Sequence, residues 1–123
     1  HEDDFEFVIA HPEGYELDSS KTKGAKIEYD QKKAFEGADF VYTKNWSSYK
    51  DYGKVVSKDR SWTITADKMA LTDRAKFMHC LPVRRNVVVA DEVLDADTSI
   101  VIEQANNRTF SAQIVLKKII ENM

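Results

Sequence analysis

Short apolar runs, separated by turn residues and by amphipathic segments, predict strands that alternate with helices along this chain. Four runs have the aromatic and β-branched residues that strands favour: residues 5–10 (FEFVIA), 27–29, 40–43 (FVYT) and 76–80. None of them alternates cleanly between apolar and polar positions, as a half-exposed strand would. Continuous apolar runs are typical of strands covered on both faces, so the pattern predicts a parallel sheet and the α/β class.

Helices are expected between these strands. Residues 31–37 contain helix formers and a closing glycine, and Asp30 is placed to cap the first turn. We predict further helices over residues 65–74, with Thr65 as the cap, 91–94 and 109–122. The last is amphipathic, because Ala112, Val115, Leu116, Ile119 and Met123 recur at spacings of three and four residues. Residues 99–102 are expected to be extended, and residues 46–52 irregular or weakly helical.

Composition narrows the class of protein. The 123 residues, 42% hydrophobic and 32% charged, fit one small globular domain or part of a larger one. A net charge of −3 gives no basic footprint for nucleic acid or for a membrane surface. A single cysteine cannot form an internal disulfide, which favours a cytoplasmic location. Because His1 and a polar HEDD lead directly into an apolar run, we interpret the chain as beginning inside a larger protein.

Three strand ends carry residues suited to binding. Residues 11–13 (HPE) follow the first strand, 44–46 (KNW) the third, and 79–82 (HCLP) complete the fourth. Ligands of open parallel sheets bind beyond the carboxyl ends of the strands. If the strands are parallel, all three groups lie at one edge of the sheet. We therefore expect a ligand site there.

Metal and nucleotide chemistry are not indicated. The single cysteine and the three histidines show no ligand spacing, and neighbouring strand residues such as His79 and Cys80 point to opposite faces. Neither glycine-rich phosphate-binding motif occurs. We expect no cofactor.

The residues around Cys80 leave several interpretations open. A single cysteine at a strand end is most often a small buried hydrophobe. Arg84 and Arg85 follow closely, however, and nearby positive charge can activate a thiol or hold an anion. Arg108 becomes relevant if residues 106–108 form a turn at the same edge. An anion-binding site, a nucleophile and a redox thiol all fit this pattern.

Several motifs, in order, cover nearly the whole chain: EFVIAHPEGYEL, KIEYDQKKAFEGADFVYTKNWSSY, HCLPVRRNVVVADEVLD and SIVIEQANNR. Together they resemble the carboxyl-terminal domain of the aspartate/ornithine carbamoyltransferase family, and its acylornithine members most. The resemblance implies a Rossmann-like open parallel sheet flanked by helices. It also implies transfer of a carbamoyl group from carbamoyl phosphate to the δ-amine of an ornithine derivative.

The resemblance implies a role for each matching residue. His79, Cys80 and the Leu81 carbonyl would place the amine and the carbamoyl group, without a covalent intermediate. Arg108, in NNR where the family has ENR, would hold the carbonyl oxygen as charge develops on it. Lys44 and Arg84 would bind substrate carboxylates, and Glu13, Trp46 and Pro82 complete the expected substrate-binding set.

Positions at which this chain departs from the family pattern indicate which substrate to expect. Ornithine-specific members carry an aspartate and a Ser-Met-Gly loop where residues 44–49 read KNWSSY, which is typical of the acylornithine branch. Acetylornithine enzymes have a lysine where this chain has Val88. N-succinyl-L-ornithine is therefore favoured over N-acetyl-L-ornithine.

The family's other half is not in this sequence. Its Ser-x-Arg-Thr phosphate-binding motif does not occur, and the first strand and helix of the second domain are also missing. We expect residues 1–123 to be the ornithine-derivative-binding domain of an arginine-biosynthetic homotrimer that is inactive alone and binds neither nucleic acid nor membranes. The alternative is a non-catalytic α/β module that binds a small anion or an amino acid.

Overall fold

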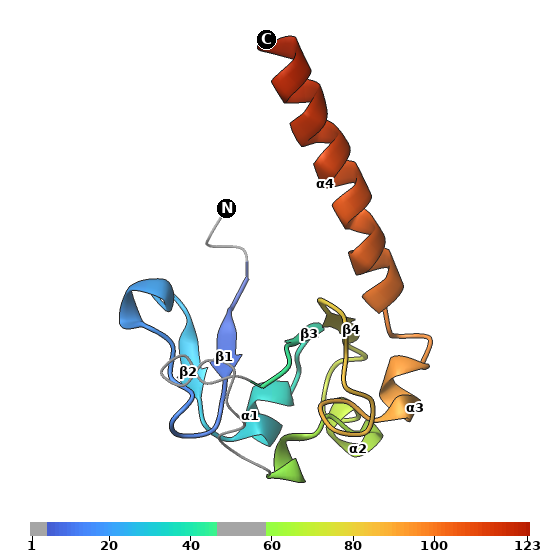
Figure 1. Ribbon diagram of the computed structural model, residues 1–123. Coiled ribbons are helices and arrows are strands. Elements are labelled where there is room, and N and C mark those ends of the chain that lie inside the picture. Colours follow the sequence, from blue (N-terminus) through green and yellow to red (C-terminus); the bar gives the residue numbers. More distant parts are fainter. Residues whose placement is uncertain (1–4, 47–58) are drawn as a thin grey trace.

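The computed structural model describes residues 5–46 and 59–123, and has short strands alternating with helices (Figure 1). The strands are β1 (Val8–Ala10), β2 (Lys26–Glu28), β3 (Phe40–Thr43) and β4 (Lys76–His79). The helices are α1 (Gln31–Phe35), α2 (Ala66–Met69), α3 (Asp91–Leu94) and α4 (Val101–Glu121), with 3-10 turns η1 (Ser19–Lys21) and η2 (Arg60–Trp62). The predicted strands and the α/β class are confirmed. Most of the predicted irregular segment 46–52 lies outside the described residues.

The strands form two parallel pairs. β1 pairs with β2, placing Ile9 opposite Ile27, and β3 pairs with β4, placing Val41 opposite Phe77. The parallel direction agrees with the prediction. The single continuous sheet that it implied is not formed, because the described residues make two separate two-stranded sheets.

Local hydrogen bonds explain where the first two helices begin and end. The Asp30 side chain accepts from the backbone N–H groups of Lys32 and Lys33, as a cap should, and α1 begins at the next residue. The predicted helix over residues 65–74 is wrong in length, since α2 ends at Met69. The Thr72 hydroxyl closes the chain there by donating to the Met69 carbonyl (2.7 Å) and accepting from the Ala75 N–H (3.0 Å). Thr65 makes no side-chain cap bond.

The hydrophobic core lies against the β3–β4 pair. Phe77 of β4 is fully buried, and its backbone donates to the Thr98 carbonyl and accepts from the Ile100 N–H, both at 2.9 Å. The other buried apolar residues are Phe35, Val41, Ile64, Ala75, Val88, Val89, Val93, Leu94 and Val101. This packing fixes β4, and with it the start of the HCLP segment.

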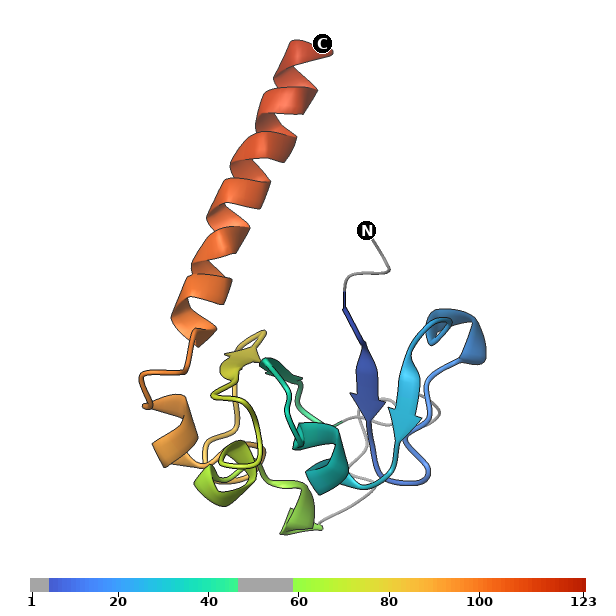
Figure 2. The ribbon, with the colours of Figure 1, turned by 180° about the vertical axis from the view of Figure 1, so that it is seen from behind.

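α4 is longer than predicted and leaves the body of the molecule (Figures 1 and 2). The expected turn at residues 106–108 is wrong, as is the second half of the expected extended run at 99–102, because the helix begins at Val101. After Pro82 the chain has no proline or glycine to stop a helix, and an asparagine costs only tenths of a kcal/mol there. No described helix is both long and apolar enough to cross a membrane.

Candidate active site at the carboxyl ends of the strands

The residues after β1 form a compact turn. His11 is only 9% exposed, its Nδ1 lies 2.9 Å from the Pro12 carbonyl oxygen, and its ring packs edge-on against Tyr29. Gly14 has φ +86°, a backbone conformation that a side chain would strain, so the turn requires a glycine there. Glu13 consequently lies exposed at the tip of the turn.

β1 and β3 flank a cavity of about 330 Å³, and the residues that follow both strands line it. His11 and Pro12 enter from β1, and the exposed Lys44 and the half-buried Trp46 enter from β3. Ile64 and Val88 contribute apolar lining. The predicted convergence of the first and third strand ends is therefore confirmed.

Asn45 joins the end of β3 to the HCLP segment. Its side-chain amide donates to the Pro82 carbonyl at 2.9 Å. Its buried Oδ1 has no partner among the described residues. Sequence reasoning noted Asn45 at the strand end but did not include it among the site residues. The only feature of the sequence that could have indicated a role for Asn45 is its position between Lys44 and Trp46.

His79, the last residue of β4, is fully buried and has a defined tautomer. The Leu81 N–H donates to its Nδ1 at 3.0 Å, so the imidazole proton belongs on Nε2. Burial lowers the pKa of His79 below its ordinary value of 6.5, which keeps the ring neutral at pH 7. Nε2 is buried and has no partner in the described part of the chain. His79 thus holds one buried N–H donor that no group in the described part of the chain engages.

Cys80 directly follows His79, the last residue of β4. It is half-buried and adjoins Tyr42, whose pKa is raised chiefly by burial and secondly by the interaction with the Cys80 thiol. Among the described residues the His79 ring binds the Leu81 N–H and makes no hydrogen bond to this thiol. Leu81 has φ +45°, in the left-handed region that a leucine rarely adopts. The backbone therefore turns sharply at the HCLP segment.

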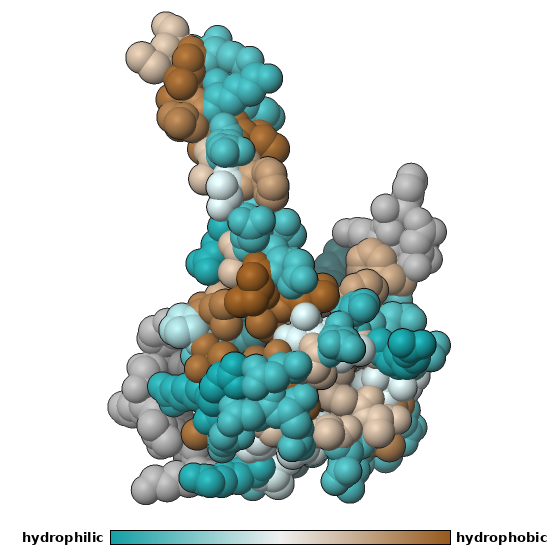
Figure 3. All heavy atoms as spheres, turned by 90° about the vertical axis from the view of Figure 1, so that its right-hand side faces the viewer, coloured by the Kyte–Doolittle hydropathy of each residue, from teal (hydrophilic) through white to brown (hydrophobic). Residues whose placement is uncertain are grey.

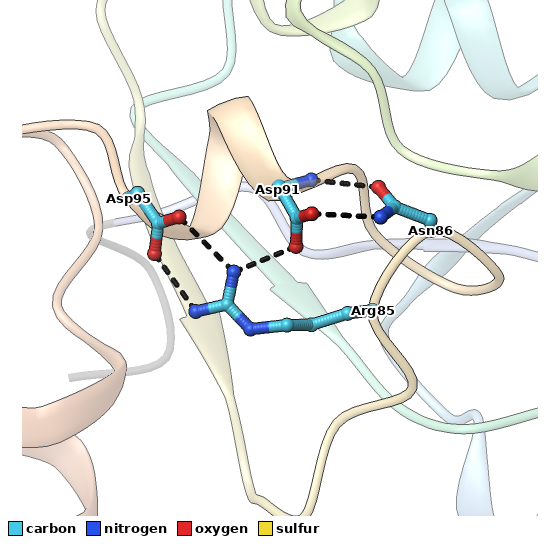
Figure 4. A network of polar contacts seen from close by, with 4 residues as sticks. All are labelled: Arg85, Asn86, Asp91 and Asp95. Carbon is cyan, nitrogen blue, oxygen red and sulfur yellow. Dashed lines mark hydrogen bonds and ion pairs between the residues drawn. The ribbon is translucent and has the colours of Figure 1, made fainter.

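The two neighbouring arginines have different surroundings. Arg85 makes a two-pronged contact with Asp95 (3.0 and 2.8 Å) and binds Asp91 at 2.7 Å (Figure 4). These bonds lower the pKa values of both carboxyl groups and raise the pKa of the guanidinium. Arg84 is exposed and forms no ion pair within the described regions. The Arg85 side chain is therefore occupied by its ion pairs at the two ends of α3, whereas the Arg84 side chain is available to a ligand.

Arg108 is not brought to this cluster. It lies within α4 and is exposed, and no hydrogen bond or ion pair among the described residues joins it to the HCLP segment. The structure thus groups His79, Cys80, Leu81 and Pro82 with Asn45, and groups Lys44 and Trp46 with the β1 turn. The same part of the chain contains no cluster of three or more metal-ligating side chains.

Parallel strands whose carboxyl ends carry a histidine donor, an amide and available cations define an α/β domain suited to a small polar ligand. The sequence matches the family described as "Aspartate/ornithine carbamoyltransferase, Asp/Orn binding domain" over residues 4–119. The chain belongs to the aspartate/ornithine carbamoyltransferase family.

Similar proteins include both acylornithine branches. The N-succinylornithine carbamoyltransferase of Bacteroides fragilis is 57% identical over 122 residues, which is 98% of this chain and 38% of the relative. The N-acetylornithine carbamoyltransferase of Xylella fastidiosa is 37% identical over 89 residues, 68% of this chain and 26% of that relative. The chain thus spans under two-fifths of the length of these relatives.

Solved structures give the same picture. A crystal structure of N-acetyl-L-ornithine transcarbamylase superimposes with a TM-score of 0.73 at 30% identity, covering 84% of this chain and 37% of that one. A mutant of an N-acetyl-L-ornithine transcarbamylase, complexed with carbamyl phosphate and N-succinyl-L-norvaline, superimposes equally well, with a TM-score of 0.73. The Rossmann-like fold of these carbamoyltransferases is therefore the fold of this chain.

Proposed function

We propose that this chain is the ornithine-derivative-binding part of an enzyme that transfers a carbamoyl group from carbamoyl phosphate to the δ-amine of N-succinyl-L-ornithine. The observation that carries the proposal is 57% identity, over 98% of the chain, to N-succinylornithine carbamoyltransferases of two Bacteroides species. Identity to the N-acetylornithine enzyme of Xylella fastidiosa is 37% over a shorter stretch.

Val88 also favours the succinyl substrate. It is 2% exposed and lines the cavity between β1 and β3, where acetylornithine enzymes are expected to have a lysine. A buried ammonium there would need a partner or would lose its proton. This chain has an apolar wall in its place, so the cations left to hold the acyl group are Lys44 and Arg84.

The chemistry requires positioning and charge stabilisation. The δ-amine attacks the carbamoyl carbon, the carbonyl oxygen gains negative charge, and phosphate leaves. The Nε2–H of His79 is a buried donor suited to the carbonyl oxygen. Because the ring is neutral, it can donate a hydrogen bond to this oxygen without transferring a proton to it. The Leu81 carbonyl would accept a hydrogen bond from the attacking amine and Cys80 would help to orient that amine, whose proton leaves with the phosphate. We assign Arg108 to the same oxygen, approaching from α4 when the site is complete.

The remaining expected residues hold the substrate's other end. Arg84 and Lys44 would each bind a carboxylate of N-succinyl-L-ornithine, as exposed cations at the two strand ends. Trp46 would pack on the succinyl chain, and Pro82 and Glu13 would complete the substrate-binding set.

The rest of the active site lies outside residues 1–123 in this proposal. The chain spans 38% of its relatives, so the carbamoyl phosphate-binding domain belongs to the part not seen here. We propose a full-length cytoplasmic homotrimer in arginine biosynthesis. The isolated chain should form no citrulline-type product.

The test is a carbamoyl-transfer assay of the full-length protein with succinyl-, acetyl- and free ornithine. We expect the highest kcat/KM for N-succinyl-L-ornithine, and a rise of about tenfold or more in its KM for Arg84→Gln, the loss of one charge-assisted hydrogen bond. Arg74→Gln is the matched control, because this exposed arginine precedes β4 at the strand's other end. A preference for free ornithine, or equal effects of both substitutions, would refute the assignment.

A further inference from the structure

The η2 turn is held by the side chain of one lysine in α2. The Lys68 ammonium donates to the Ser61 carbonyl and, at 2.8 Å, to the Thr63 carbonyl. It also donates to the side-chain oxygen of Gln31 at 2.5 Å. An ammonium has three N–H donors and no acceptor, so these three contacts use all of them. Lys68 is half-buried and forms no ion pair among the described residues.

Gln31 connects the same lysine to Trp62. It is the first residue of α1, where the Asp30 cap fixes the backbone. Its side-chain Nε2 donates to the Trp62 carbonyl at 3.1 Å. Because the Lys68 ammonium can only donate, the oxygen of the Gln31 amide must face the lysine and its NH₂ group must face Trp62. The two side chains therefore hold three successive backbone carbonyls, those of residues 61–63.

A charged group is disfavoured where Lys68 lies. Burial lowers the pKa of Lys68 and the nearby Lys32 lowers it further, whereas Asp59 acts in the opposite direction. A half-buried ammonium without a carboxylate partner needs hydrogen bonds to compensate for its lost hydration. Here all of them come from Gln31 and the η2 turn. A residue that only filled space could be apolar at no such cost, so the lysine is explained by the turn that it holds.

The turn held in this way forms part of the candidate site. Trp62 and Gln31 line the 330 Å³ cavity between β1 and β3, together with Lys44 and Trp46 at the end of β3. Trp46 and Trp62 are the two tryptophans of the chain, and both are half-buried. Two indole rings and an exposed lysine are suited to a short apolar chain that ends in a carboxylate.

The chain beyond the turn is fixed independently of Lys68. The Ile64 N–H donates to the Val88 carbonyl and the Ile64 carbonyl accepts from the Ala90 N–H, both at 2.9 Å. The Trp62 carbonyl, in contrast, accepts only the bond from α1 among the described residues. Loss of Lys68 should therefore release the turn and leave the surrounding fold in place.

We infer that Trp62 is a specificity-determining residue for the acyl end of the substrate, and that Lys68 and Gln31 are positioning residues that act through it. In this arrangement the Trp62 indole contacts the methylene groups of a succinyl chain whose carboxylate lies at Lys44, beside Trp46. An acetyl group is too short to reach the same wall. The inference deepens the proposed function and rests on it for the identity of the ligand.

A double-mutant cycle in the full-length protein tests the inference. The probe is N-succinyl-L-norvaline, a ligand of the transcarbamylase mutant described above that lacks the reacting amine, and its Kd is measured by calorimetry with carbamoyl phosphate present. We expect Trp62→Ala to raise this Kd at least about tenfold, and to raise that of N-acetyl-L-norvaline less than about threefold. Lys68→Met should raise the first Kd about tenfold in the wild-type background, but less than about twofold when Trp62→Ala is present.

Lys33→Met is the matched control, because Lys33 is an exposed lysine of α1 whose side chain makes no hydrogen bond or ion pair among the described residues. This variant should leave both Kd values unchanged. If Lys68→Met does not fold, Gln31→Met takes its place in the cycle. That variant removes the bond to the Trp62 carbonyl and keeps both backbone contacts of Lys68.

Four results would overturn the inference. They are no binding of N-succinyl-L-norvaline, equal effects of Trp62→Ala on the two analogues, an effect of Lys68→Met that is equally large in both backgrounds, and an equal effect of Lys33→Met. Because the norvaline analogues cannot react, the cycle does not depend on turnover. A protein that gives the expected cycle but carbamoylates no ornithine derivative would refute only the proposed function.

Discussion

His79 connects the fold to the proposed chemistry at the scale of single residues. Its ring is buried, its Nδ1 is occupied by the Leu81 N–H, and its Nε2–H is left for a ligand. The burial that fixes the orientation of the His79 ring also lowers its pKa. One side chain thereby links ligand binding to the pH dependence of folding.

The first prediction concerns that pH dependence. The pKa of His79 is below 6.5 in the folded protein, and near 6.5 when unfolded. As the pH falls through about 6.5 the unfolded state binds a proton that the folded state rejects, so the free energy of unfolding decreases. Urea unfolding of the chain should give a lower free energy at pH 5.5 than at pH 7.5. His79→Gln should flatten the change, and His11→Gln should retain it; an equal decrease in His79→Gln would contradict the assignment.

The residue pattern alone reached the HCLP residues without separating Arg84 from Arg85, and the family resemblance then selected Arg84. Proline after an apolar run marks a strand end, and strand ends of parallel sheets bind ligands, which is why His79 and Cys80 could be singled out. Which arginine is available depends on Asp91 and Asp95, and the fold of the intervening loop brings these to Arg85. The Asn45–Pro82 bond likewise joins positions 37 residues apart, a contact that no local pattern encodes.

At the scale of elements, α4 is the least supported part of the chain. Every residue from 106 onward is exposed, including Phe110, Ile114, Leu116 and Ile120. Figure 3 shows apolar atoms gathered along one side of its outer part. The predicted amphipathic helix is confirmed over 109–121, yet its apolar side has no partner among the described residues. The helix begins at Val101, eight residues before the predicted start at Thr109, because neither the apolar run at 99–102 nor the asparagines at 106 and 107 interrupt it.

The second prediction follows from this exposure. Deleting residues 110–123 should change the free energy of unfolding of the remaining chain by less than about 1 kcal/mol, since little buried surface is lost. Val101→Ala, at the buried first residue of α4, should cost about 1–2 kcal/mol and is the matched comparison. Urea denaturation followed by near-ultraviolet circular dichroism measures both. A truncated chain that unfolds at lower urea than the Val101 variant would show that α4 contacts the core.

Strand pairing was the other element-scale failure. The pattern predicted four parallel strands at nearly correct positions, because each needs only a local apolar run. The pattern did not predict that the described strands form two separate pairs, β1 with β2 and β3 with β4. Pairing joins residues that are far apart in the sequence, so a local pattern does not encode it.

At the scale of the whole molecule, the described residues have the surfaces of an incomplete unit. The described residues leave the aromatic residues of β3 and the apolar side of α4 exposed. The chain spans 38% of the Bacteroides relative, and the Ser-x-Arg-Thr phosphate-binding motif does not occur in its sequence. Catalysis, in this account, needs the rest of the protein.

The most direct test of that account is a chimera. In the Bacteroides fragilis enzyme, the aligned 122 residues are replaced by those of this chain, and the kcat/KM for N-succinyl-L-ornithine is measured with saturating carbamoyl phosphate. We predict transfer within about tenfold of the parent enzyme, a loss of no more than about 1.4 kcal/mol of transition-state stabilisation, and at least about a hundredfold decrease when His79→Gln is added. A folded chimera that binds carbamoyl phosphate but carbamoylates no ornithine derivative would contradict it.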